Sequence, residues 1–159
     1  MDILYSISLF AHYNYILVLF IGDAIFVLLN LKRRDFRYKL MLLTVSFAIS
    51  FLLTDLAKGF YKVERPCQLI AGKVECPKTY GFPSLHASTS IVFPLVALGT
   101  NSFIIFYLAA IFIAVSRIYL GVHTLDQVVG GLCVGIVSYF IGIYVVGRIK
   151  HYFRGVFVE

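Results

Sequence analysis

The sequence predicts an all-α protein, an integral membrane helical bundle of about five transmembrane helices. Three observations lead to this fold class. Hydrophobic residues make up 60% of the 159 residues and charged residues only 14%, against about 25% charged residues in soluble domains. The apolar residues form blocks close to the ~20 residues that a helix needs to cross a bilayer. These blocks do not show the alternating polarity of membrane β-barrel strands.

The predicted spans follow one another along a single membrane-embedded domain, residues 1–159. The segment before the first span lacks the basic start and small-residue cleavage site of a signal peptide. We therefore expect it to be retained, as a short interfacial segment rich in Tyr and Phe. An outer loop is expected at about residues 58–85 and a basic tail at about residues 147–159. The spans are expected at about residues 13–31, 40–57, 86–98, 103–119 and 127–146.

Within the fifth span, Gly131 and Gly135 have the spacing of small residues that is typical of closely packed membrane helices. We therefore expect this part of the span to approach another helix closely.

The distribution of Lys and Arg predicts the orientation in the membrane. Eight of these residues lie in the connection after the first span and in the tail, and six lie on the opposite face. Cytoplasmic segments carry the excess of Lys and Arg. We therefore expect a cytoplasmic C-terminus, with the N-terminus and the outer loop on the outer or lumenal side of a plasma or ER-type membrane. The basic residues are dispersed among the connections, which argues against nucleic acid as a partner.

The outer loop carries Cys67 and Cys76, each beside a proline. In an oxidising compartment the pair could form a disulfide. Two free thiols are the alternative, and a metal site is disfavoured because the loop holds no further Cys or His. The residues between the two cysteines are expected to be extended on either side of a turn at Gly72.

Three polar clusters are expected at the outer ends of the spans. Lys58 and Arg65 belong to the first cluster, Pro83 to His86 open the third span, and Ser116 to Asp126 connect the fourth span to the fifth. The predicted topology brings these distant segments to one membrane depth on one side. Taken singly, each residue has a structural interpretation, such as an arginine that reaches the lipid headgroups. Taken together, the clusters indicate a site.

The residue types in these clusters suit a phosphate group. Lys58, Arg65 and Arg117 supply many N–H donors, and arginine bonds phosphate oxygens in pairs. Ser84 lies where the start of a helix would direct free backbone N–H groups at an anion. His86 and His123 provide a nucleophile and a general acid. Because the clusters contain no set of residues with metal-ligand spacing, a metal-independent phosphoryl transfer without a cofactor fits best.

The order and spacing of these motifs resemble the type 2 phosphatidic acid phosphatase superfamily of membrane phosphatases. The pattern K-x6-R-P corresponds to Lys58 through Pro66, P-S-x-H to Pro83 through His86, and S-R-x5-H to Ser116 through His123. The resemblance covers about residues 40–145.

The resemblance implies a role for each matching residue. His123 matches the nucleophile that forms a phosphohistidine. His86 matches the general acid that protonates the leaving group and later helps to activate water. The phosphate-binding residues of the family correspond to Lys58, Arg65, Ser84 and Arg117.

The sequence departs from the family pattern at two positions. Leu85 stands where the family usually has glycine. The acid that usually follows the nucleophile by four residues is replaced by Gln127, and Asp126 comes one residue earlier. On a helix both positions lie near the face of His123, so either Asp126 or Gln127 could orient the imidazole. The glutamine resembles the dolichyl-diphosphatase and glucose-6-phosphatase branches.

The resemblance thus implies an enzyme that hydrolyses a lipid-linked phosphate at the outer bilayer surface. The preferred substrate is a polyprenyl diphosphate, dolichyl or undecaprenyl, which would give the monophosphate and inorganic phosphate. A broader lipid phosphatase acting on phosphatidic acid or phosphatidylglycerophosphate is the alternative. A transporter, or a non-enzymatic phosphate-binding membrane protein, is a less favoured interpretation because the polar residues gather at one face instead of through the depth of the spans.

Overall fold

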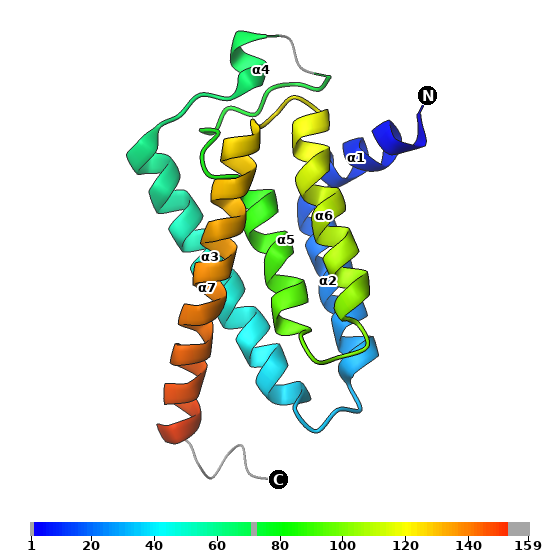
Figure 1. Ribbon diagram of the computed structural model, residues 1–159, viewed down its shortest axis with the longest axis vertical. Helices are drawn as coiled ribbons and strands as arrows, with labels where there is room; N and C mark the ends of the chain where they lie inside the picture. The colour runs from blue at the N-terminus through cyan, green and yellow to red at the C-terminus, as the bar shows by residue number, and fades with distance from the viewer. Residues whose placement is uncertain (1, 71–72, 153–159) are drawn as a thin grey trace.

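The computed structural model describes residues 2–70 and 73–152, and the regular secondary structure in this part of the chain consists of helices (Figure 1). The prediction of an all-helical protein is therefore confirmed. The helices are α1 (Ile3–Tyr13), α2 (Tyr15–Asn30), α3 (Phe36–Tyr61), α4 (Pro66–Leu69), α5 (Leu85–Val96), α6 (Phe103–Tyr119) and α7 (Leu125–Tyr152).

An apolar helix lies at each of the predicted spans, but the helices differ in length. Phe36–Leu69 and Leu125–Ile149 are long and apolar enough to cross a bilayer on their own. Helices α1 and α2 add a third span if the pair counts as one, although it bends by 95°. Helices α5 and α6 are shorter apolar helices, and the shortness of α5 agrees with the shorter third span that the sequence predicts.

Helix α5 can be short because it lies in the centre of the bundle and packs against α3, α6 and α7 (Figure 1). Most of its side chains are small and buried. Gly131 and Gly135 of α7 let the α7 backbone approach the carbonyls of Ser84 and Ser88 so closely that a Cβ atom at either glycine would collide with them. The close helix packing expected from the glycine spacing is therefore observed, and it fixes α7 against the start of α5.

A cluster of apolar side chains from several helices fills the other half of the bundle. Phe93 of α5 stacks on Phe106 of α6 with ring centroids 5.1 Å apart, and Phe26 of α2 is fully buried beside them. Outside this core, large hydrophobic side chains of α2, α6 and α7 are exposed, with exposed fractions of 66% for Phe20 and 63% for Phe140. An apolar exterior around an apolar core is what a bundle in lipid requires.

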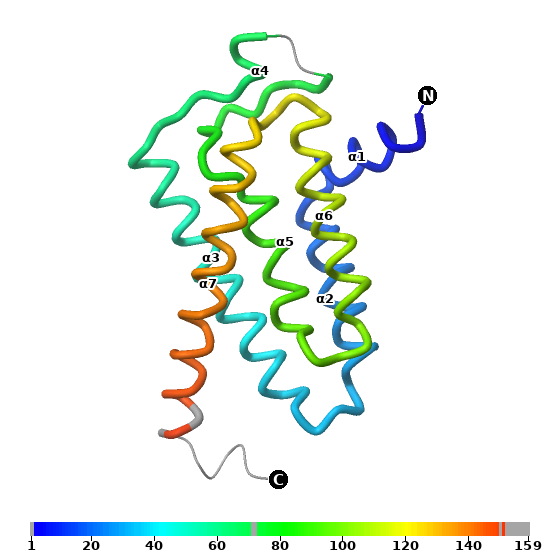
Figure 2. Tube along the Cα trace, viewed as in Figure 1, coloured from blue at the N-terminus to red at the C-terminus, as the bar shows by residue number. Residues whose placement is uncertain are grey.

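The connections divide the bundle into two ends (Figures 1 and 2). The α3–α5 connection, which contains α4, lies with the α6–α7 connection and α1 at one end. The α2–α3 connection and the end of α7 lie at the opposite end, together with the basic residues from Lys32 to Lys39. The three polar clusters therefore share one end. Of the tail expected at 147–159, residues 153–159 lie outside the described part.

One local expectation in the outer loop is wrong. The chain after Pro66 forms the short helix α4, not the extended piece expected there, while Ile70 is extended. The expected turn at Gly72 lies outside the described residues. Proline is well placed at the first position of a helix because it has no N–H to leave unbonded there, and Gln68 bonds back to the Arg65 N–H. The proline was thus a helix-start signal.

Candidate active site

A cavity of about 400 Å³ opens at the end of the bundle where the polar clusters meet. It is lined by five residues predicted for the site, Lys58, Arg65, His86, Arg117 and His123. Leu85, at the position where the family usually has glycine, lines the cavity as well. Ser84 and Gln127 lie behind this wall and are buried, whereas Asp126 is exposed.

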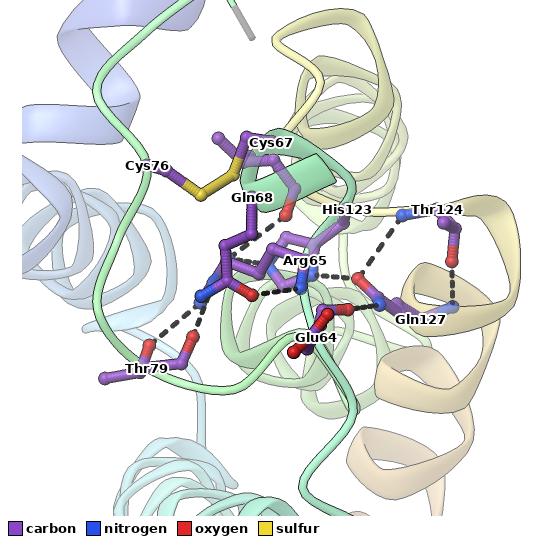
Figure 3. Close-up of a disulfide and its surroundings, with 10 residues drawn as sticks. Glu64, Arg65, Cys67, Gln68, Cys76, Thr79, His123, Thr124 and Gln127 are labelled. Atoms are coloured by element: carbon purple, nitrogen blue, oxygen red, sulfur yellow. Dashed lines mark hydrogen bonds between the residues drawn. A yellow bond between two sulfur atoms is a disulfide. The ribbon is translucent and has the colours of Figure 1, made fainter. Parts of the chain in front are cut away.

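His123 is held at its Nδ1 atom by Gln127 (Figure 3). The distance from Nδ1 to Gln127 Oε1 is 3.0 Å, and His123 is only 2% exposed. Asp126 makes no such contact, and no hydrogen bond or ion pair of its side chain was found in the described part of the chain. Of the two residues that the sequence left open, Gln127 is the one in contact with the imidazole.

The surroundings of the Gln127 amide determine which nitrogen of His123 carries the proton. Gln127 Nε2 donates to the Glu64 carbonyl at 2.8 Å, and Gln127 Oε1 accepts from the Thr124 N–H at 3.3 Å. The amide oxygen therefore faces His123, where it can only accept a hydrogen bond. It follows that the proton lies on Nδ1 and the lone pair on Nε2, which faces the cavity side of the ring.

The lone pair of His123 Nε2 accepts a hydrogen bond from Arg65. Arg65 Nη1 lies 2.8 Å from Nε2 and 3.2 Å from the Val122 carbonyl. On the other side of the guanidinium, Arg65 Nε and Nη2 donate to the carbonyl and the hydroxyl of Thr79 at 2.7 and 2.9 Å (Figure 3). A phosphate that accepts the hydrogen bond from Arg65 Nη1 would therefore free the lone pair of His123 Nε2.

The loop around Thr79 is a part of the site that the sequence motifs do not include. Lys58 Nζ donates to the Tyr80 carbonyl at 2.7 Å, so this loop holds two of the three cations. The next residue, Gly81, packs directly on the Gln127 amide, where a Cβ atom would lie 2.6 Å from Nε2. Glycine followed by Phe82-Pro83 is a turn signal, but it does not reveal that the turn covers Gln127.

Cys67 and Cys76 form a disulfide beside the cavity (Figure 3). Cys67 lies in α4, which follows Arg65 directly, and Cys76 lies in the cavity wall three residues before Thr79. The bond therefore ties the segment that carries Arg65 to the segment that accepts its hydrogen bonds.

His86 lies across the cavity from this network and has an unused nitrogen. Its Nε2 atom is buried and has no hydrogen-bond partner in the described part of the chain. One face of the ring packs against Tyr15, with centroids 3.9 Å apart, and the Tyr15 hydroxyl bonds Thr89 one turn further along α5. The Ser84 N–H donates to the Gln127 carbonyl at 2.9 Å, which couples the start of α5 to the start of α7. The Ser84 hydroxyl is also buried, and it has no hydrogen-bond partner among the residues that the structure describes.

Arg117 is fully buried, and its contacts come partly from α1. Its Nε and Nη2 atoms donate to the Ser116 hydroxyl at 3.0 and 2.8 Å. Nη2 also reaches the Ser8 carbonyl at 3.4 Å, and Nη1 donates to His12 Nδ1 at 3.2 Å. His12 itself lines the cavity. The sequence motifs contain no signal for this contact, because α1 precedes all of them.

The cavity has an excess of positive charge. Lys58, Arg65 and Arg117 line it together with Lys78, and Glu75 is the one carboxylate in its lining. The ion pairs found among the described residues join Asp35 to Arg33 and Lys39, which lie in the α2–α3 connection and at the start of α3. The described residues contain no group of three or more His, Cys, Asp or Glu side chains that could hold a metal ion. The cavity is thus suited to an anion.

Gln127 and Asp126 offer a matched pair of substitutions. We expect Gln127→Leu to lower kcat by about 10-fold or more, because the neutral imidazole then loses the acceptor that fixes its proton on Nδ1. We expect Asp126→Asn, on the exposed neighbour, to stay within about 2-fold of wild type. The kcat of each variant is measured from steady-state hydrolysis of a lipid phosphate. A loss confined to the Asp126 variant would contradict the assignment.

The environment of His123 also predicts its titration. Burial, followed by the positive charge of Arg65, lowers the pKa of His123 from 6.5 to about 3. The ring therefore stays neutral on acidification from about pH 8 to pH 5, and an NMR titration of labelled histidines should show no midpoint for it in that range. Between pH 6.5 and about 3, the histidine is protonated in the unfolded chain but neutral in the folded one. This group therefore lowers the stability of the fold as the pH falls below about 6.5. A midpoint near 6.5 for the resonance that His123→Asn removes would contradict this.

The fold and the site define a membrane-embedded phosphatase. A family model, the PAP2 superfamily, matches residues 39–151, and the chain belongs to this superfamily. Among solved structures, the chain is similar to LpxE from Aquifex aeolicus, with 26% identity, a TM-score of 0.69 and coverage of 86% of this chain and 84% of that one.

A second similar structure is the PAP2-type phosphatidylglycerolphosphate phosphatase from Bacillus subtilis. It has 22% identity and a TM-score of 0.63, and the match covers 93% of this chain and 77% of that one. This second likeness shows the shared fold. A search of curated protein sequences found no match. The chain is therefore an integral membrane enzyme, a lipid phosphatase of the PAP2 superfamily.

Proposed function

We propose that this chain is a lipid phosphatase of broad type that hydrolyses glycerolipid phosphate monoesters through a phosphohistidine on His123. The observation that carries the proposal is the lone pair of His123 Nε2. The Gln127 amide orients the ring, and Arg65 meets Nε2 at 2.8 Å in the cavity wall. An unprotonated imidazole nitrogen beside a guanidinium is a nucleophile placed next to a phosphate-binding group.

The reaction then has two steps. His123 Nε2 attacks phosphorus and the bond from phosphorus to the lipid oxygen breaks, while His86 gives a proton to that oxygen. Water next attacks the phosphohistidine, His86 takes a proton from this water, and inorganic phosphate leaves with the imidazole restored. Lys58, Arg65 and Arg117 bind the phosphoryl oxygens and stabilise the charge that develops on them. Ser84 adds a buried hydroxyl at the start of α5, which has no partner in residues 2–70 and 73–152 and could donate to a phosphoryl oxygen.

Two lipid classes are candidates for the substrate. Phosphatidic acid and phosphatidylglycerophosphate come first, because the fold resembles a phosphatidylglycerolphosphate phosphatase. A polyprenyl diphosphate is the second candidate, because Gln127 replaces the usual acid and bonds His123, as the resemblance to the dolichyl-diphosphatase branch implies. Both substrates would place the reacting phosphate among the same cations.

The test is phosphate release from each lipid in detergent micelles, with EDTA present throughout. We expect turnover of phosphatidic acid and phosphatidylglycerophosphate that EDTA does not reduce. Preference for undecaprenyl or dolichyl diphosphate by more than about 10-fold in kcat/KM would instead establish the second candidate. Loss of activity with EDTA that added metal restores would overturn the metal-independent mechanism.

We propose further that the end of the bundle with the site faces the outer or lumenal side. The Cys67–Cys76 disulfide supports this orientation, because such bonds persist in oxidising compartments. In sealed vesicles of known orientation, a membrane-impermeant maleimide should label the pair from the outside after mild reduction. Labelling from the cytoplasmic side alone would reverse the topology.

A further inference from the structure

We propose that His12 is a positioning residue of the active site, which holds Arg117 in place for the substrate phosphate through its Nδ1 atom. The proposal depends on Arg117 binding phosphate, as proposed above. His12 lies in α1, outside the region 39–151 that the family model matches. The inference therefore concerns a part of this chain that the family motifs do not describe.

The first step of the argument is the burial of the Arg117 charge. Arg117 is 0% exposed, and no carboxylate in the described part of the chain lies within ion-pair distance of it. A buried charge without a counter-ion is costly unless hydrogen bonds replace its lost hydration. Neutral acceptors must therefore hold this guanidinium.

The second step is that α1 supplies two of the three acceptors and receives two of the four hydrogen bonds. Ser116 Oγ receives the hydrogen bonds from Nε and from Nη2. The Ser8 carbonyl and His12 Nδ1 receive the other two, at 3.4 and 3.2 Å. His12 is the one acceptor for Nη1 among the described residues, and this leaves the second N–H of Nη1 without a protein partner.

The third step concerns the state of the His12 ring. Arginine can only donate hydrogen bonds, so Nδ1 of His12 must be the unprotonated nitrogen and the ring carries its proton on Nε2. His12 lines the same cavity as His86, and the two rings are stacked with centroids 6.4 Å apart. The imidazole in this position orients Arg117 Nη1 beside the cavity. The second N–H of Nη1 remains available for an anion.

Helix α1 does not continue the line of α2. The two helices meet at 95°, and α1 extends sideways from the bundle while it packs against α6 (Figure 1). Ser8 and His12 of this helix are the residues that reach Arg117 of α6.

The experiment compares His12→Ala with His12→Asn, because the asparagine Oδ1 can occupy about the place of Nδ1 and accept from Nη1. We expect His12→Ala to lower kcat/KM about 10-fold or more, since Arg117 loses its fixed position, and His12→Asn to restore most of this loss. The apparent Kd for inorganic phosphate, from its thermal stabilisation of the protein, should follow the same order. Phe10→Ala, on an exposed side chain of the same helix, is the matched control and should resemble wild type.

A second background separates positioning from a merely structural role. In Arg117→Lys the side chain has no Nη1, so His12→Ala should change kcat/KM by less than about 2-fold there. Equal losses for the Ala and Asn variants, or a full additional loss in the Arg117→Lys background, would overturn the proposal. Phosphate binding that weakens in His12→Ala supports it even if none of the tested lipids is turned over, in which case the proposed substrate fails and the role of His12 stands.

Discussion

Replacement of His123 by asparagine is expected to reduce lipid phosphate hydrolysis by at least about 10³-fold, which is the scale seen when a covalent nucleophile is removed. Asparagine can still accept or donate a hydrogen bond toward Gln127, so the surrounding network keeps a partner of moderate size. The residue is buried, and its Nε2 atom faces Arg65. The loss should therefore appear in kcat, with phosphate binding by the three cations largely retained.

The measurement has two parts. Steady-state turnover gives the loss, and rapid quenching with ³²P-labelled lipid should trap an acid-labile phosphoenzyme in the wild type and none in the variant. His151→Asn, the same substitution at an exposed histidine near the end of α7, is the control and should leave turnover unchanged. Label that persists in the His123 variant would mean that another residue is the nucleophile.

Which motif residues surround the cavity could be predicted from the sequence, because the motifs themselves name these residues. Lys58, Arg65, His86, Arg117 and His123 all line one cavity. Their convergence followed from the order of the spans, since the α3–α5 and α6–α7 connections lie at one end of the bundle and bring the span ends beside them together. The same reasoning requires only that the spans alternate in direction, and the helix lengths do not affect it. The shortness of α5 therefore did not disturb the prediction.

The choice between Asp126 and Gln127 could not be predicted, for a physical reason. The argument from helix faces assumes that His123 lies on the helix, but α7 begins at Leu125. His123 precedes the helix, so its ring turns back over the first turn and meets the residue whose amide is also bonded to the Glu64 carbonyl. The backbone at residue 64, sixty-three positions away, decides the contact.

The contributions of His12 and Thr79 were hidden for a related reason. Both act through tertiary contacts from segments without a recognisable motif, one across the bend before α2 and one in the loop after Cys76. A bend of 95° at Asn14 cannot be inferred from an apolar pattern that continues on both sides of it. The acceptors at Thr79 and Tyr80 are backbone carbonyls. Every residue has a backbone carbonyl, so the sequence does not indicate which ones bind a cation.

Replacement of His86 by asparagine is expected to have an effect that depends on the leaving group. For a lipid alkoxide, which must be protonated as it departs, the loss in kcat should be about 10²–10⁴-fold, the usual contribution of a general acid. For p-nitrophenyl phosphate, whose leaving group is stable as an anion, the first step needs little help from His86. Its buried Nε2 atom has no hydrogen-bond partner within the described part of the chain, and His86 lines the cavity, so this nitrogen is available to serve as the acid.

The two steps of the reaction make the test sharper. If His86 also activates water in the second step, the variant should release one p-nitrophenolate per enzyme in a rapid burst and then turn over slowly, because the phosphohistidine accumulates. Damage to the packing against Tyr15 would act differently, because a distorted site lowers the burst and the lipid reaction alike. Equal losses on both substrates without a burst would therefore remove His86 from the acid role, whereas a large difference between them would assign it.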